Sequence, residues 1–270
     1  MGKSEPMDNQ KGIAIVTGAS GGIGYELAKL FARDGYSLLL VARSGEKLRT
    51  VSAELASTYA IDATACRVDL AEAGACDQVL AAAQKSNRPV HVLVNNAGFG
   101  SWGPFVETDP QVTLGMLQVN IVALTALTRL FLPSMVARKC GRILNVSSVA
   151  AFQPGPLMAV YYASKAYVLH FSEALADELR QTGVTVTALC PGPTATGFEQ
   201  RATLGESWLF SGGGALDARM VAEVGYRGLM QGRRIVIPGL WHKLLVLGER
   251  LVPRRVVVRI VRGLQERRGK

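Results

Sequence analysis

Residues 12–24 read Gly12-Ile-Ala-Ile-Val-Thr-Gly-Ala-Ser-Gly-Gly-Ile-Gly24, and this stretch decides the fold. Its first five residues form a short apolar run, which is typical of a buried parallel strand. Glycines follow at positions 18, 22 and 24, ahead of a segment with apolar residues at helical spacing. We therefore expect a strand, a glycine-rich turn and a helix in direct succession, which lets the backbone approach a dinucleotide pyrophosphate.

Apolar strand-like runs alternate with helical ones along the rest of the chain. Strands are expected at 37–42, 64–68, 90–95, 142–147, 184–189 and 234–238, and helices at 25–34, 44–59, 72–86, 111–138, 159–182 and 217–231. This alternation predicts an α/β fold with a doubly wound parallel sheet covered by helices on both faces. The ligand should then lie at the carboxyl ends of the strands. Residues 191–214 carry no clear element and are expected to form a functional loop.

Length and composition favour one domain followed by a tail. The chain has 270 residues, 49% of them hydrophobic, and no linker-like stretch interrupts the pattern. The expected division is a flexible N-terminus at 1–10, the domain at 11–238 and a basic helical extension at 239–270. The polar N-terminus is neither a secretory signal nor a membrane span. The four cysteines form no C-x-x-C pair, which predicts a reduced cytoplasmic protein without a metal site.

The net charge of +9 belongs entirely to the C-terminal tail. Residues 233–270 hold 11 basic and 2 acidic side chains, whereas the remaining residues hold 19 of each. The sequence contains no helix-turn-helix, RRM or zinc pattern, so nucleic-acid binding is not expected.

The tail is expected to contain an amphipathic helix after Pro253. One face would carry Val257, Ile260, Val261 and Leu264, and the opposite face Arg255, Arg259, Arg262 and Glu266. Two interpretations stay open. The apolar face packs on the domain or on a neighbouring subunit, or the helix meets an anionic surface together with Trp241 and the 244–247 run. That surface would be a membrane leaflet or the phosphates of an acyl carrier.

A second motif, Tyr161-Tyr-Ala-Ser-Lys165, follows Ser148 by thirteen positions. Tyr161 and Lys165 are four residues apart in an expected helix and share a face. A lysine ammonium beside a phenol should lower the pKa of Tyr161 from about 10 toward the working pH. Tyr161 is then a general acid in carbonyl reduction and a base in alcohol oxidation. Ser148 would hydrogen-bond the substrate oxygen, with the adjacent Ser147 as the alternative.

Together these motifs resemble the short-chain dehydrogenase/reductase family, in its classical branch. Further family motifs occur in order within residues 11–238: Asn95-Asn-Ala-Gly98 after the fourth strand, Asn120 in the next helix, and Pro191-Gly192 with Thr196. The resemblance implies a Rossmann fold, a nicotinamide dinucleotide and carbonyl–alcohol oxidoreduction. It also implies a homodimer or homotetramer assembled through the helices at 111–138 and 159–182.

The resemblance implies a role for each site residue. The catalytic set would be Asn120, Ser148, Tyr161 and Lys165, with Asn120 supporting a proton-relaying water and Lys165 also binding the nicotinamide ribose. Asp69 matches the residue at the adenine. The full set expected to bind the cofactor is Gly18, Ser20, Gly22, Ile23, Gly24, Arg43, Asp69, Asn96, Tyr161, Lys165, Thr194 and Thr196.

The end of the second strand favours NADP(H) over NAD. The chain has Arg43 there in place of an acidic residue, and a guanidinium suits a 2′-phosphate. The alternative is an exposed arginine without such a role.

The sequence thus predicts an NADPH-dependent reductase of a ketone or aldehyde. Tyr162 and Ser164, inside the second motif, are expected to pack away from the Tyr161 face. An apolar substrate, such as a 3-oxoacyl chain or a steroid-like ketone, is expected from the aromatic and apolar residues near the strand ends. These residues are Phe99, Trp102, Phe105, Phe152, Leu157, Met158, Trp208 and Phe210. Two rival functions are a non-catalytic NADP-binding redox sensor and a peripheral membrane protein whose enzymatic body is secondary.

Overall fold

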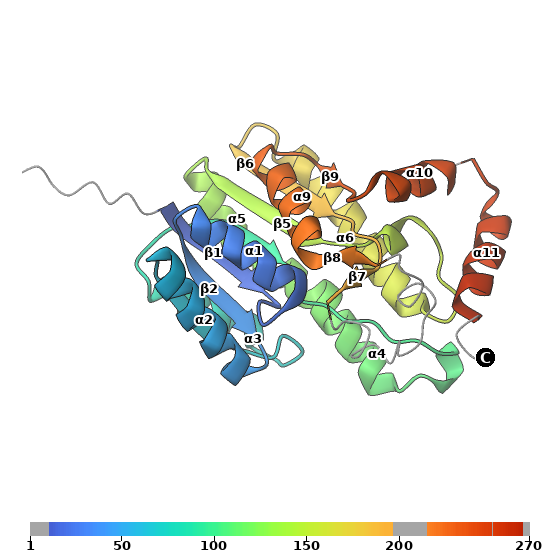
Figure 1. Cartoon of the computed structure of the whole chain (residues 1–270), viewed down its shortest axis with the longest axis horizontal. Helices are drawn as coiled ribbons and strands as arrows, with labels where there is room; N and C mark the ends of the chain where they lie inside the picture. The colour runs from blue at the N-terminus through green and yellow to red at the C-terminus, as the bar shows by residue number, and fades with distance from the viewer. Residues whose placement is uncertain (1–10, 197–214, 250, 267–270) are drawn as a thin grey trace, which may run out of the picture.

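The protein is built on one parallel sheet of seven strands, in the order β3-β2-β1-β4-β5-β6-β9. The computed structural model describes residues 11–196, 215–249 and 251–266. Helices cover both faces of the sheet (Figure 1), which confirms the doubly wound α/β fold. The strands are β1 (Lys11–Thr17), β2 (Tyr36–Ala42), β3 (Ala63–Arg67), β4 (Val90–Asn95), β5 (Gly141–Val146), β6 (Val184–Leu189) and β9 (Ile235–Val236).

The strand order places a crevice beside β1. The chain runs outward from β1 to β2 and β3, then returns to the other side of β1 with β4. Loops leaving β1 and β4 therefore diverge at the carboxyl edge of the sheet, where α/β proteins of this kind hold their ligands. Both strands are apolar and buried, as strands covered on two faces must be.

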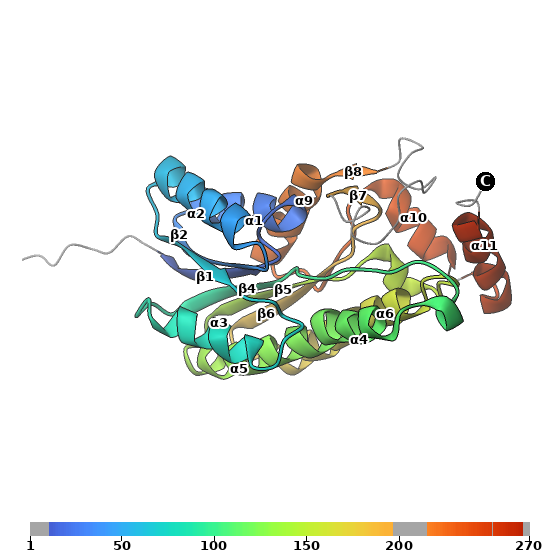
Figure 2. The same cartoon turned by 90° about the horizontal axis from the view of Figure 1, so that it is seen from below.

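One face of the sheet is covered by α1 (Gly22–Arg33), α2 (Gly45–Tyr59) and α9 (Ala218–Met230), which lie together above it in Figure 2. Phe31 of α1 is fully buried and meets the Tyr226 ring of α9 edge to face, with centroids 5.0 Å apart. This contact joins the first helix of the fold to its last core helix, so the two helices form one layer over this face of the sheet.

The opposite face is covered by α3 (Ala75–Gln84), α4 (Pro110–Leu117), α5 (Leu124–Ala137) and α6 (Ala159–Glu178). A π-helical turn, η2 (Gln118–Ala123), joins α4 to α5. The sequence predicted one continuous helix at 111–138. The structure instead widens that helix at its centre, and π turns of this kind often occur at functional sites.

Within the described residues, one helical stretch, Pro110–Ala137, has the length and hydropathy of a membrane span. Its side chains Leu127, Phe131 and Met135 are nevertheless buried in the core beneath the sheet. Part of the apolar character of this stretch therefore serves packing within the domain.

Short elements complete the described chain. Two 3₁₀ helices, η1 (Phe105–Glu107) and η3 (Val149–Phe152), follow β4 and β5. In the loop expected after β6, β7 (Thr194–Ala195) pairs in parallel with β8 (Leu216–Asp217). The strand expected at 234–238 is ordered as a strand only over β9. Pro238, which lacks an amide donor, follows β9 after one residue.

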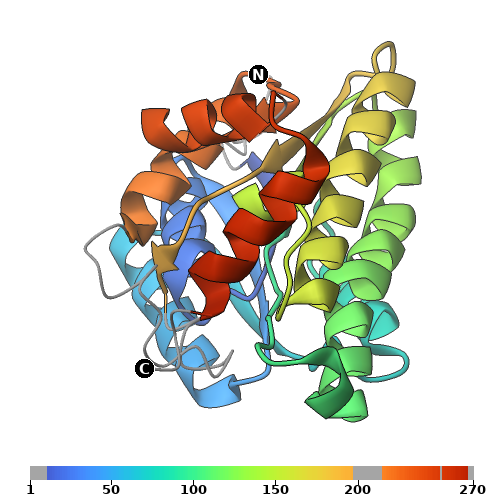
Figure 3. The same ribbon diagram turned by 90° about the vertical axis from the view of Figure 1, so that its right-hand side faces the viewer.

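The C-terminal tail forms two helices, α10 (Leu240–Glu249) and α11 (Arg254–Glu266). Figure 3 shows α11 running across the end of the domain, between α10 and the helices of the other face. The tail therefore stands in front of the carboxyl edge of the sheet. Residues 1–10, expected to be flexible, lie outside the described residues.

Candidate active site

A cavity of about 970 Å³ opens at the carboxyl edge of the sheet. The glycine turn, the ends of β2, β4 and β5, the 191–196 segment and both C-terminal helices line it. It gathers the expected catalytic and cofactor-binding residues with two exceptions: neither Gly24 nor Asn120 lies on its wall.

The glycine turn after β1 requires its glycines. Gly18 and Gly22 have φ values of +66° and +56°, a conformation that other residues adopt only with strain. A Cβ at Gly24 would collide with the carbonyl oxygen of Gly18, so Gly24 serves close packing of the turn on α1. No side chain caps the first amides of α1 after Gly21. These free donors at a helix N-terminus fit a pyrophosphate group.

Thr17 and Asn96 fix the glycine turn, a positioning contact that the motif analysis missed. The Thr17 hydroxyl donates to Val94 O (3.1 Å) and accepts from the amides of Asn96 (2.9 Å) and Ala97 (3.0 Å). The Asn96 side-chain amide donates to Thr17 O (2.9 Å) and Gly18 O (3.3 Å). These hydrogen bonds join the loop after β1 to the loop after β4. Both N–H groups of the Asn96 side-chain amide donate within the protein.

The edge of the cavity beside β2 is basic. Arg43 is exposed and lies 3.8 Å from the Asp69 carboxylate. Ser44 and Lys47, which the sequence analysis did not name, line the same end of the cavity. Both lie at the start of α2 within four residues of Arg43. This closeness along the chain was the feature of the sequence that could have indicated their place in the cavity wall.

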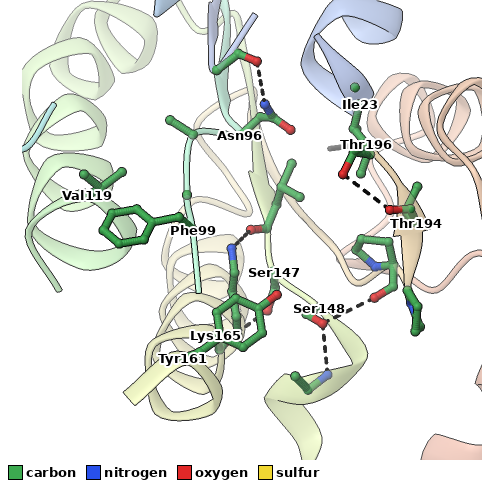
Figure 4. A pocket seen from close by; sticks show the side chains of 18 of the residues that line it. Ile23, Asn96, Phe99, Val119, Ser147, Ser148, Tyr161, Lys165, Thr194 and Thr196 are labelled. Carbon is green, nitrogen blue, oxygen red and sulfur yellow. Dashed lines mark hydrogen bonds between the residues drawn. The ribbon is translucent and has the colours of Figure 1, made fainter. Parts of the chain in front are cut away.

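Ser147 and Ser148 have different surroundings. Ser147 is buried, and its hydroxyl donates to Lys165 O (2.8 Å) inside the protein. Ser148 lines the cavity, accepts from the Ala150 amide (3.1 Å) and hydrogen-bonds the Tyr161 phenol. Both serines line the cavity (Figure 4), but the Ser147 hydroxyl is engaged with Lys165 O, which favours Ser148 as the serine that a substrate meets.

Tyr161 and Lys165 stand side by side on α6, with the Lys165 ammonium 5.9 Å from the Tyr161 ring centre. The expected lowering of the Tyr161 pKa is not found. Burial raises that pKa to about 12, although the hydrogen bond from Ser148 opposes the rise. Burial also lowers the pKa of Lys165 to about 8. The prediction from the sequence included the effect of the Lys165 charge, which lowers the pKa of Tyr161. It did not include the free-energy cost of removing a phenolate from water, which raises that pKa.

Lys165 is held from behind as well. Its Nζ donates to Val146 O at 2.9 Å, and the side chain is 6% exposed. A Cβ at Gly98 would lie 3.4 Å from that Nζ, so the loop after β4 passes close to it. The ammonium is therefore fixed at the base of the cavity.

Asn120 lies in the π-helical turn and supports the loop after β4. Its Oδ1 accepts from the Phe99 amide (3.1 Å), and its Nδ2 donates to Phe99 O (2.9 Å) and Ser164 Oγ (3.0 Å). Ser164 in turn donates to Tyr161 O (2.7 Å). Ser164 packs inside the protein as expected, and both residues connect the catalytic helix to the β4 loop.

The segment after β6 reaches the glycine turn. Thr194 donates to Gly192 O (2.8 Å), and Thr196 donates to Thr194 O (3.3 Å). A Cβ at Gly22 would lie 2.8 Å from the Cβ of Thr196, so the two cofactor-binding segments are in contact.

The expected apolar lining is only partly correct. Phe99 and Met158 line the cavity, whereas Trp102, Phe105, Phe152 and Leu157 are not part of its wall. Phe105 is exposed, and Trp102 and Phe152 pack against small clusters beside the cavity. Trp208 and Phe210 lie outside the described residues.

The C-terminal helices supply a wall of the cavity that is mostly apolar, with the polar His242 and Gln265 among its residues: Trp241, His242 and Leu245 from α10, and Val261, Leu264 and Gln265 from α11. Val257 and Val261 pack on Ala150, Met158 and Tyr162, so an apolar face of α11 packs on the domain. Ile260 is a correction to the expected face, because it is 54% exposed and Gln265 occupies the buried position. Gln265 lies on the buried face because residues 257, 261 and 265 are four apart and so share one side of the helix.

Comparison with known proteins places this arrangement among dinucleotide-dependent enzymes. The family model described as short chain dehydrogenase matches residues 12–207. A short-chain dehydrogenase from Sphingobium yanoikuyae, solved in complex with NADPH, has a TM-score of 0.80 and 30% identity, covering 89% of this chain and 95% of that one.

Two curated relatives extend the comparison. A very-long-chain 3-oxoacyl-CoA reductase of Phaeosphaeria nodorum is 32% identical over 276 residues, which cover 94% of this chain and 76% of the relative. A short chain dehydrogenase of Pseudocercospora fijiensis is 40% identical over 181 residues, or 66% of this chain and 58% of that protein. The chain thus spans less than two thirds of the length of some curated relatives.

Proposed function

The chain belongs to the short-chain dehydrogenase family of oxidoreductases, and on that premise we propose that it reduces the carbonyl of an apolar ketone or aldehyde with NADPH. The observation that carries the proposal is the meeting of Ser148, Tyr161 and Lys165 with the glycine turn in one cavity. A proton donor and a dinucleotide cradle on the same wall are the requirements of such a reaction.

The proposed roles follow from the surroundings of each group. When bound, NADPH supplies the hydride. Tyr161, whose pKa burial raises to about 12, is protonated at neutral pH and gives its proton to the substrate oxygen. Ser148 donates a hydrogen bond to the same oxygen as its charge develops. The charge of Lys165, fixed beside the ring, stabilises the phenolate that proton transfer leaves behind.

A panel of carbonyl compounds tests the proposal. The panel contains 3-oxoacyl thioesters, ketosteroids and simple aryl ketones, with NADPH consumption as the readout. Turnover of any class above the Tyr161→Phe background supports the proposal. Tight NADPH binding without turnover of any class would instead favour a redox sensor that uses the fold as a switch.

The cofactor preference is the finer part of the proposal. The fold holds a nicotinamide dinucleotide, and we assign NADP(H) because Arg43 and Lys47 bring two cations to the end of the cavity beside β2. Arg43 forms an ion pair with Asp69. A 2′-phosphate between the basic side chains would gain charge-assisted hydrogen bonds that a bare ribose hydroxyl does not offer.

Replacing Arg43 with Ala should raise the KM for NADPH by about tenfold or more, because a charge-assisted hydrogen bond contributes roughly 1.5–3 kcal/mol. The KM for NADH should change little. Steady-state kinetics with both cofactors measure the effect, and Arg49→Ala, an exposed arginine of α2 outside the cavity wall, is the matched control. Equal losses with NADPH and NADH would show that Arg43 acts structurally.

We also propose that the protein is cytoplasmic and touches an anionic membrane surface through α10. Of its ten residues only Val246 is buried, and Leu240, Trp241, Leu244 and Leu247 are each more than half exposed. The neighbouring α11 presents exposed arginines. An apolar patch beside basic side chains fits the interface of an anionic bilayer. Because Trp241 also lines the cavity, the patch continues into its mouth.

The double variant Leu244→Asp, Leu247→Asp should abolish sedimentation with phosphatidylserine vesicles while leaving reduction of a soluble ketone unchanged. Neither leucine lines the cavity, and both are exposed, so the fold should tolerate the charges. Wild-type binding should weaken at high salt. Failure of the wild-type protein to bind vesicles would contradict the proposal, and binding only to an acyl carrier would assign the basic tail to that partner.

The assembly implied by the family is a further proposal. Val112, Leu114, Val122 and Tyr167 are exposed on α4, η2 and α6. These apolar side chains support a homodimer or homotetramer formed through the outer faces of those helices.

A further inference from the structure

The last turn of α11 buries an amide against the cavity. Gln265 is 1% exposed, although it precedes the exposed Glu266 near the C-terminus. It lines the cavity with Val261 and Leu264 of the same helix. A glutamine at such a site must find partners for both ends of its amide, because burying an unpaired polar group is costly.

One end of this amide is anchored. Gln265 Nε2 donates to the Tyr162 hydroxyl at 3.0 Å, across 103 positions of sequence. Tyr162 is itself immobile: a Cβ at Gly155 would collide with its ring, and the ring stands edge to face on Tyr161 with centroids 6.1 Å apart. The Gln265 side chain is therefore held at a fixed position relative to the proposed proton donor.

The other end of the amide has no hydrogen-bond partner within residues 11–196, 215–249 and 251–266. Gln265 Oε1 is buried and accepts no hydrogen bond from the residues that the structure describes. The cluster on which α11 packs contains Val257, Val261 and Met158, which carry no donor, and Trp102, whose buried Nε1 also has no partner among the described residues. Because Gln265 lines the cavity, a molecule that occupies the cavity is a source of a hydrogen-bond donor for its Oε1.

We propose that Gln265 recognises the substrate: its Oε1 accepts a hydrogen bond from an O–H or N–H group that the apolar carbonyl compound carries away from its reacting carbon. This inference rests on the proposed function and names the substrate class more closely. A hydroxylated polycyclic ketone and a thioester whose arm contains amide groups share this donor chemistry. A plain hydrocarbon ketone does not, and would leave the oxygen unpaired.

The test uses rigid polycyclic ketones with a hydroxyl at successive ring positions, their methyl ethers and their deoxy analogues. For at least one position, wild-type enzyme should have a kcat/KM about 5- to 10-fold higher for the hydroxyl compound than for its ether and deoxy partners, the effect expected of one hydrogen bond. Gln265→Met, which keeps length and removes both polar atoms, should erase that preference, so that the hydroxyl, ether and deoxy compounds have equal kcat/KM. Glu266→Gln, an exposed neighbour, is the matched control.

Calorimetry with the corresponding alcohols in the presence of NADP separates this inference from the proposed function. If the enzyme reduces none of the ketones, the proposed function fails, while the binding preference still reports on Gln265. Equal affinity for hydroxyl, ether and deoxy compounds at every position would overturn the inference, and so would a preference that survives in Gln265→Met. Should that variant not fold, the wild-type series decides alone.

Discussion

Replacing Tyr161 with Phe is expected to lower kcat for carbonyl reduction by about two to four orders of magnitude, the range for loss of a general acid. The substitution removes only the phenolic oxygen, which hydrogen-bonds Ser148 in the cavity. The ring keeps its contacts with Tyr162, so NADPH should bind with unchanged affinity. Stopped-flow and steady-state kinetics measure the loss, and fluorescence titration measures the binding of NADPH.

Tyr167→Phe is the matched control on the same helix. Tyr167 is 37% exposed and bonds Thr125 at 2.9 Å, far from the cavity wall. Removing its hydroxyl should change kcat by less than about twofold, as surface substitutions do. If Tyr161→Phe turned over at a similar rate to this control, another group would have to be the proton donor.

Replacing Ser148 with Ala should lower kcat by about 10²- to 10³-fold, the cost of removing one donor to a developing oxyanion. The free energy of unfolding should fall by less than about 2 kcal/mol, because the hydroxyl caps the Ala150 amide and donates to Pro191 O at 3.4 Å. Steady-state kinetics and a melting curve on the same preparation separate the two effects.

Ser147→Ala provides the contrast, one residue away. Its hydroxyl is the donor to the buried Lys165 O, so its loss should lower the free energy of unfolding by roughly 1–3 kcal/mol. The fall in kcat should be smaller than for Ser148→Ala. The reverse pattern, with the larger kcat loss at Ser147, would exchange the roles of the two serines.

The sequence could predict the sheet because its pattern is local. Each strand is a short apolar run, and each helix repeats apolar residues at its own period, so burial on both faces follows from neighbouring residues. The expected strand at 90–95 coincides with β4, and that at 184–189 with β6. The widened turn at Asn120 was missed, since an extra residue in a helical turn leaves no trace in an apolar period.

The cavity shows the limit of the same approach. Helical spacing paired Tyr161 with Lys165, because residues four apart share a helix face, whereas Ser148 was named through the resemblance to the family. The sequence pattern did not predict the desolvation that raises the pKa of Tyr161, which depends on every group packed around the phenol. It also placed Trp102 and Phe152 on a wall that neither helps to form.

The order of strands and helices, the glycine-rich turn after the first strand and the shared helix face of Tyr161 and Lys165 could be predicted from the sequence alone, because neighbouring residues encode each of them. Only the tertiary structure decided which side of the basic tail is buried and what it covers. Gln265 meets Tyr162 across 103 positions, and no local pattern encodes a contact at that distance. That contact depends on how α11 packs across the end of the sheet, and the resulting wall shapes the end of the cavity beside Tyr161 and Tyr162.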